Sequence, residues 1–148
     1  MISLRNFMKD DAVILQKNSH SDLSVEQVES LICEWNQKQV NGKYFEMFAV
    51  LFDNNIVGTV SLYQHSTEVI SIGPDIFEAY RQRGYAKQAM LYACDIAKKK
   101  GYKIVSQQIR INNIASLALH SSLGFETNSL IYTNSKGNQV AIYLKCLL

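Results

Sequence analysis

Paired cysteines, long apolar runs and concentrated charge are all missing from this chain of 148 residues. Its three cysteines, Cys33, Cys94 and Cys146, lie far apart, and no CxxC pair or His/Cys cluster offers a metal site. An odd count without a secretory segment favours reduced, packed thiols. No apolar run approaches membrane-spanning length, and the first seven residues alternate like a strand instead of forming a signal peptide. We therefore expect a soluble, cytoplasmic protein that binds no metal.

Charge is spread thinly, with 15 basic against 13 acidic side chains and a formal net charge of +2. No broad basic face with interleaved aromatic residues is present, so we do not expect a nucleic-acid partner, although the small positive charge leaves an RNA-bound substrate open. Without an apolar run of spanning length we expect no membrane partner. The lysine run at 98–100 falls in the last turn of a predicted helix closed by Gly101, where cations favour the helix dipole. A hydrophobic content of 47% at this length predicts one core and a single domain over residues 1–148.

Hydrophobic periodicity predicts helices and strands in an order typical of mixed α/β domains. A capping box formed by Ser24 and Gln27 opens a predicted helix over 25–35, and Asp53-Asn54-Asn55 predicts a hairpin between two strands. The other predicted helices are a short one after residue 9 and those over 86–100 and 115–123. Strands are predicted at 1–7, 45–52, 56–63, 69–72, 104–109, 130–133 and 140–144. This order predicts a mixed, strongly curved sheet flanked by helices.

The stretch 80–87, Tyr-Arg-Gln-Arg-Gly-Tyr-Ala-Lys, is a cationic turn between a buried strand and an amphipathic helix. The free N–H groups of the first helical turn point outward there, with the positive end of the helix dipole behind them. Arg81, Arg83 and Lys87 add full charges at the same place, and Gly84 lets a ligand approach the backbone closely. Such a turn is suited to bind phosphate.

The spacing Arg81-x-x-Gly84-x-Ala86 resembles the coenzyme A pyrophosphate motif of the GNAT superfamily of N-acetyltransferases. The segment 113–125 resembles the family's later motif, Asn-x-x-(Ala/Ser)-x-x-Leu-Tyr-x-x-x-Gly-Phe, at every fixed position but one. The departure is His120, where the family most often has Tyr. The two motifs follow the family's order, and the resemblance implies an α/β GNAT fold: a mixed, strongly curved sheet of about seven strands flanked by about four helices.

The resemblance also implies acetyl-CoA as acetyl donor and a set of residues that bind it. The pyrophosphate would lie on the turn, and the pantetheine arm would lie beside the splayed end of the preceding strand. Glu78 stands where relatives often have Pro, which leaves the register of the pantetheine contacts open, and Asn113 is equally suited to cap a helix. The implied cofactor-binding residues are Ile76, Phe77, Glu78, Arg81, Gln82, Arg83, Gly84, Tyr85, Ala86, Lys87, Asn113 and Ser116.

Acetyl transfer to a primary amine needs a base for the ammonium and an acid for the leaving thiolate. By resemblance His120 takes the place of the family's proton donor, although a His among leucines could simply be packed. Glu78, Asp75, Glu46 or a water chain could each serve as the base, and the sequence does not choose. The acceptor, a small molecule or a peptide N-terminus, is also open, and so is the oligomeric state, with a homodimer as one option. The alternatives are a ribosomal-protein-like N-terminal acetyltransferase and a non-catalytic acyl-CoA sensor.

Overall fold

A mixed sheet forms the centre of the protein, for which a computed structural model describes all residues 1–148. The sheet runs in the order β1-β3-β4-β5-β6-β9-β7, with β2 added beside β3 and β8 beside β9. Every pairing is antiparallel except that of β5 with β6. The strands are β1 (Ile2–Asn6), β2 (Gln39–Val40), β3 (Lys43–Phe52), β4 (Asn55–Gln64), β5 (Val69–Ile76), β6 (Ile104–Arg110), β7 (Glu126–Thr127), β8 (Tyr132–Thr133) and β9 (Gln139–Cys146).

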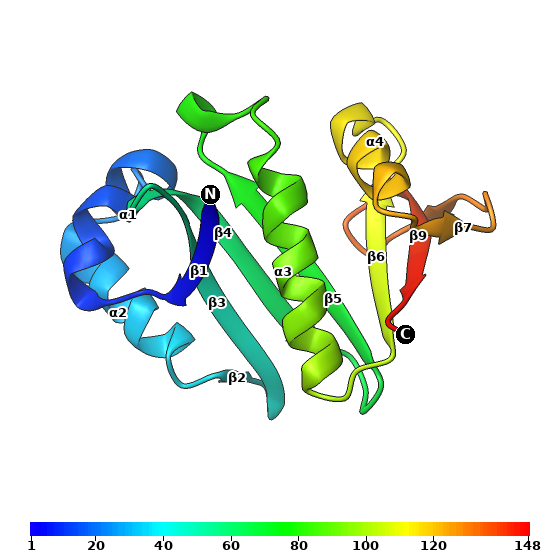
Figure 1. Ribbon diagram of the computed structural model, residues 1–148, viewed down its shortest axis with the longest axis horizontal. Helices are drawn as coiled ribbons and strands as arrows, with labels where there is room; N and C mark the ends of the chain where they lie inside the picture. Colours follow the sequence, from blue (N-terminus) through cyan, green and yellow to red (C-terminus); the bar gives the residue numbers. More distant parts are fainter.

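Four α-helices flank this sheet, as the GNAT resemblance implied (Figure 1). They are α1 (Ala12–Ser19), α2 (Val25–Trp35), α3 (Tyr85–Lys99) and α4 (Ile114–Ser122), with short 3-10 turns η1 (Lys9–Asp11) and η2 (Glu78–Tyr80). The capping box is confirmed, because the Ser24 Oγ accepts from the Gln27 N–H at 3.1 Å and the Gln27 Oε1 accepts from the Ser24 N–H at 2.8 Å. None of the helices combines the length and the apolar character needed to cross a membrane.

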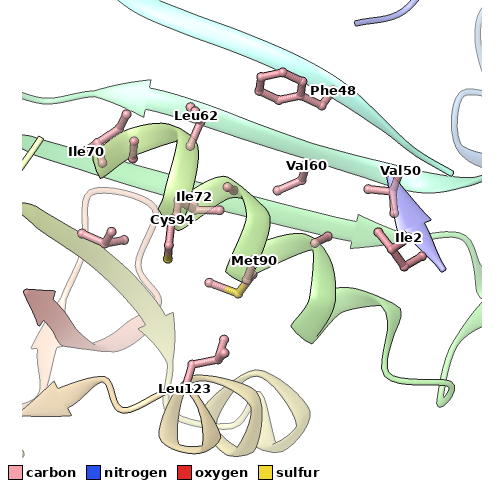
Figure 2. Close-up of a cluster of buried hydrophobic side chains, with 14 of the residues drawn as sticks. Ile2, Phe48, Val50, Val60, Leu62, Ile70, Ile72, Met90, Cys94 and Leu123 are labelled. Atoms are coloured by element: carbon pink, nitrogen blue, oxygen red, sulfur yellow. The ribbon is translucent and has the colours of Figure 1, made fainter. Parts of the chain in front are cut away.

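The two faces of the sheet bury separate apolar clusters. Alternate residues of β3 point to opposite faces, so that Phe48 and Val50 join one cluster while Ala49 and Leu51 join the other. The larger cluster packs α3 and the end of α4 against β3, β4 and β5, with Met90 and Cys94 of α3 at its centre (Figure 2). The smaller one packs α1 and α2 against the opposite face. The helices thereby hold the sheet from both sides.

Several predicted elements differ in the structure. The strand predicted at 69–72 continues to Ile76, and the one predicted at 140–144 extends over 139–146. The β3–β4 hairpin turns on Asp53 and Asn54 alone, both with positive φ, and Asn55 already belongs to β4. The strand predicted at 130–133 is reduced to the two residues of β8. Ser129 has a φ of 63°, and side chains at 127 and 128 accept the N–H groups of residues 129 and 130, so local turn bonds replace strand pairing there. The two-residue strands β2 and β7 were not predicted.

Strands β5 and β6 separate in the middle of the sheet. Their pairing covers only Val69 with Ile104 and Ile70 with Val105, and beyond these pairs the two strands diverge towards the N-terminal end of α3 (Figure 1). Pro74 lies in the diverging part of β5, where its missing N–H costs no bond to β6. The gap between β5 and β6 is therefore the one interruption in the main path of the sheet, and it lies next to the cationic turn.

Candidate functional site

The cationic turn closes one side of a cavity of about 620 Å³, called here the turn cavity. Gln82 and Gly84 both have positive φ, 64° and 80°, and Gly84 is the N-cap of α3, so the turn depends on left-handed backbone. A Cβ built on Gly84 would meet nothing within 4 Å, which means that the space above this glycine is open to a ligand. The first N–H groups of the 15-residue helix α3 face this space without side-chain caps.

Most of the predicted cofactor-binding residues come together around the turn cavity. Phe77 does not line it, because its ring is buried in the smaller apolar cluster. Glu78, which is exposed in η2, does not line it either, and neither does Arg83, whose guanidinium lies over the Tyr80 ring at 5.9 Å. The predicted residues that do line it are Ile76, Arg81, Gln82, Gly84, Tyr85, Ala86, Lys87, Asn113, Ser116 and His120. Sequence reasoning missed Pro74, Tyr80, Ala115 and Leu119, which line it as well.

Arg81 is partly engaged within the protein. Its Nε donates to the Ile76 carbonyl at 2.9 Å, and its Nη2 lies 3.7 Å from an Asp75 carboxylate oxygen. Asn113 caps α4, because its side-chain oxygen accepts from the Ser116 N–H at 3.2 Å. The capping alternative is thus confirmed, and it fixes the start of α4 against the cavity.

A second cavity of about 340 Å³, called here the gap cavity, lies between β5 and β6 where the two strands diverge. It is lined by Ser61 and Tyr63 of β4, by 71–74 of β5, by 107–109 of β6, and by Ser116 and His120 of α4. Pro74, Ser116 and His120 line both cavities. A ligand entering along the turn and a ligand entering through the gap would therefore meet at these three residues.

Gln107, which the sequence analysis did not single out, replaces the missing strand pairing at this point. Its Oε1 accepts from the Ile72 N–H at 2.9 Å, and its Nε2 donates to the Ile72 carbonyl at 2.5 Å. The same Nε2 lies 3.1 Å from His120 Nε2. The Ile72 N–H requires an oxygen opposite it, so the orientation of the amide is fixed, and its second N–H can only donate to His120.

These bonds determine the tautomer of His120. Because Nε2 accepts from Gln107, the ring proton is on Nδ1, which lies 2.7 Å from the Ser116 carbonyl and donates to it. The side chain is buried, with 3% of its surface exposed, and its ring lies edge-on to Phe125. Burial lowers the pKa of His120 below its ordinary 6.5, outweighing the opposite effect of the bond to Ser116. The imidazole is therefore neutral, and both of its nitrogens are hydrogen-bonded within the protein. This state agrees better with a packed side chain than with a proton donor to the leaving thiolate.

None of the three candidate bases lines the gap cavity. Asp75 lines the turn cavity beside Arg81, and Glu78 is exposed outside both cavities. Glu46 is buried and accepts hydrogen bonds from Tyr44 and from Asn6. Burial alone would raise the pKa of Glu46, but these bonds and Lys38, 3.4 Å away, lower it. Its carboxylate is therefore held as a structural anion.

Comparison with known proteins identifies relatives of this chain. The family described as Acetyltransferase (GNAT) domain matches residues 2–126. The SPbeta prophage-derived uncharacterized N-acetyltransferase YokL of Bacillus subtilis (strain 168) is 29% identical over 135 residues, which are 84% of this chain and 75% of that protein.

Solved structures share the fold at low identity. The ribosomal alpha-N-protein acetyltransferase RimL in complex with coenzyme A has a TM-score of 0.85 at 14% identity, covering 98% of this chain and 93% of that one. Mutant forms of the spermidine/spermine N-acetyltransferase SpeG from Vibrio cholerae have a TM-score of 0.78 at 15% identity. The match covers 99% of this chain and 95% of that one.

Proposed function

Because this chain belongs to the GNAT acetyltransferase family, we propose that it transfers the acetyl group of acetyl-CoA to a primary amine while both are bound. The observation that carries this proposal is the meeting of two cavities at Pro74, Ser116 and His120. One cavity is lined by the cationic turn and the uncapped start of α3, which are suited to a pyrophosphate, and the other lies in the gap of the sheet. Two substrates entering from different sides can then react without a covalent enzyme intermediate.

The turn cavity is the proposed site of acetyl-CoA. The uncapped N–H groups at the start of α3 would bind the pyrophosphate, and Lys87, which has no ion pair in the structure, would add a full charge. The diverging edge of β5 would bind the amide groups of pantetheine as a neighbouring strand would. This edge and the cap of α4 at Asn113 would place the thioester at the junction of the cavities.

The gap cavity is the proposed site of the acceptor amine. The amine must lose a proton before it attacks the thioester carbon, and the thiolate of coenzyme A leaves as the tetrahedral intermediate collapses. For His120 to act as the acid, its ring would have to release Gln107 and take up a proton. Its hydrogen bonds support instead a positioning role, in which the ring holds the wall between the two cavities. The proton-donor role stays a prediction that turnover measurements can decide.

A thermal-unfolding experiment with acetyl-CoA tests the cofactor site. At a hundredfold excess over its dissociation constant, acetyl-CoA should add about 2.7 kcal/mol to the free energy of unfolding and raise Tm by about 5–10 °C. Gly84→Asp should abolish this rise, because it puts a carboxylate where the pyrophosphate binds. Gly42→Asp is the matched control: Gly42 also has positive φ, 77°, and open space around it, but it lies in the β2–β3 turn.

Catalysis is tested by thiol release with a panel of amines and peptides. Release that depends on an acceptor supports the enzyme, whereas a Tm rise without release from any acceptor at any pH would favour the acyl-CoA sensor. No Tm rise in folded protein at millimolar acetyl-CoA would refute the cofactor site. An equal Tm rise in wild type and Gly84→Asp would show that the cofactor binds elsewhere.

A further inference from the structure

A third cavity, the hairpin cavity, adjoins the gap cavity along β6. It has a volume of about 250 Å³ and lies between β6 and the β8–β9 turn. Gln108 lines both it and the gap cavity, so the two cavities are neighbours on either side of this side chain. Arg110 and Lys136 line the hairpin cavity, and no acidic side chain does. Neither cation forms an ion pair within the chain.

The turn that carries Lys136 is held firmly against β6. The Asn134 Nδ2 donates to Gln108 Oε1 at 3.1 Å, and its Oδ1 accepts the N–H groups of Lys136 and Asn138 at 3.1 and 2.9 Å. The turn therefore has a defined place relative to Arg110, and the two cations belong to one built surface instead of a mobile loop.

The gap cavity itself contains no charged side chain. Its polar groups are serine, tyrosine and glutamine side chains, together with His120, which burial keeps towards the neutral form. An acceptor with several cationic groups, such as a polyamine, would meet no carboxylate in the gap cavity. It would also be repelled by Arg110 and Lys136 in the neighbouring hairpin cavity. An acceptor that carries an anionic group beside its amine matches this charge pattern.

The spacing along β6 indicates how far the anion lies from the amine. The gap cavity reaches both faces of β6, because Gln107 and Gln108, whose side chains point to opposite faces, both line it. Gln107 stands at the junction with His120, and Arg110 follows three residues later on the same strand, on the face of Gln108. At about 3.3 Å per residue this separation is roughly 10 Å. The amine and carboxylate of a single amino acid cannot span it, but an extended peptide can, with its third residue near Arg110.

Strand β6 also offers an edge for such a peptide. Its pairing with β5 ends at Val105, and the Ser106 carbonyl beyond this point accepts from the Ser71 side chain instead of a strand. Backbone groups alternate in direction along a strand, so those of Gln108 face the same gap. An extended chain entering the gap can bond to this edge as an added strand.

We propose that the acceptor is the α-amine of a peptide or protein N-terminus with an acidic side chain at about its third residue, bound by Arg110 and Lys136. This inference rests on the proposed acetyl transfer and names its acceptor class. The charges select the acceptor mainly through binding, so the selection acts on KM more than on kcat.

The test measures thiol release with three amidated eight-residue peptides that differ only by Glu, Gln or Lys at the third position. We expect kcat/KM for the Glu peptide to exceed that for the Gln peptide by about threefold to thirtyfold, with the Lys peptide lowest. The preference should shrink at 1 M salt, where the screening length is about 3 Å. Spermidine and free glutamate complete the panel and should both be poorer acceptors than the Glu peptide.

Charge-reversal variants assign the preference to the two cations. Arg110→Glu combined with Lys136→Glu should invert the order, so that the Lys peptide becomes the best acceptor. Arg110→Glu alone should narrow the preference, whereas Lys17→Glu, the same charge change at an exposed position of α1 that lines none of these cavities, should leave it unchanged. Both substituted side chains of the double variant are exposed, and an unchanged Tm shows that each variant is folded.

Five results would overturn this inference. Equal kcat/KM for the three peptides, a preference that survives the double reversal, or spermidine as the best acceptor would each remove the anionic subsite while leaving acetyl transfer established. Free glutamate matching the Glu peptide would replace the peptide by a small anionic amine and refute the assigned spacing. No thiol release with any acceptor would refute the proposed function itself, and the acceptor class with it.

Discussion

Replacing Gln107 tests whether one amide both closes the gap between β5 and β6 and keeps His120 neutral. Gln107→Leu removes the partners of the Ile72 N–H and carbonyl and of His120 Nε2. A buried polar group left without a partner costs about 1–3 kcal/mol, and water in the adjoining cavity can satisfy part of the loss. We expect the free energy of unfolding to fall by about 2–4 kcal/mol, measured by urea denaturation.

Gln107→Glu keeps the shape of the side chain but replaces the amide, which donates a hydrogen bond to His120, by a negatively charged carboxylate. Its carboxylate can still accept from the Ile72 N–H, but it no longer donates to His120 and instead favours the imidazolium. In the wild type the pKa of His120 is lowered in the folded state, so its contribution to stability is present above pH 6.5 and is lost as the pH falls below it. In the Glu variant the pKa should rise above 6.5, so that the contribution is present below pH 6.5 and is lost as the pH rises through the folded-state value.

The stability of the wild type relative to the Glu variant should therefore increase as the pH rises from about 6 to about 8.5. Each unit of difference in the pKa of His120 corresponds to about 1.4 kcal/mol. Nitrogen NMR of the imidazole provides an independent check, since the wild type should show the proton on Nδ1 and the variant should show protons on both nitrogens at neutral pH. A wild-type ring protonated on Nε2, or the same titration in both proteins, would refute the assigned hydrogen-bond direction.

Two further predictions concern residues around the junction. Gly58→Ala should destabilise the protein strongly, by about 2–4 kcal/mol, and weaken the Tm rise with acetyl-CoA, because its Cβ would lie 2.5 Å from the Asp75 carbonyl oxygen and 2.8 Å from the Ile76 Cα. Gly73→Ala, whose Cβ would meet only the movable Ser61 side chain at 2.9 Å, should be milder, and equal losses in the two variants would contradict this reasoning. His120→Ala should lower Tm and, with saturating cofactor below Tm, reduce kcat by less than about tenfold. A loss of 10²–10⁴-fold at unchanged Tm, partly restored in His120→Tyr, would instead establish the proton-donor role.

Local patterns explain which parts of the fold could be predicted. The capping box at Ser24, the hairpin at Asp53 and Asn54, and the left-handed glycine at the start of α3 follow from interactions within a few residues. The strand predicted at 130–133 was wrong over its first half because turn bonds from side chains at 127 and 128 competed with strand pairing. Phe77 was predicted to lie at the cofactor from its place at the end of the strand before the turn, and only the fold shows that its ring packs in the smaller apolar cluster with residues of α1 and α2.

The amino-acid sequence by itself determined the order of the main helices and strands, the left-handed turn at Gly84 and the family of the chain, because these depend on short-range spacing. Only the tertiary structure decided where the gap between β5 and β6 opens and which hydrogen bonds His120 makes. The bond from Gln107 to His120 joins residues 13 apart, and the bonds from Gln107 to Ile72 join residues 35 apart. Gly58 and Arg110 also depend on distant neighbours. The fold brings the backbone of β5 against Gly58, and it brings the turn at Lys136 next to Arg110. Proton positions, burial and the charge of a cavity depend on such distant neighbours, which no local pattern specifies.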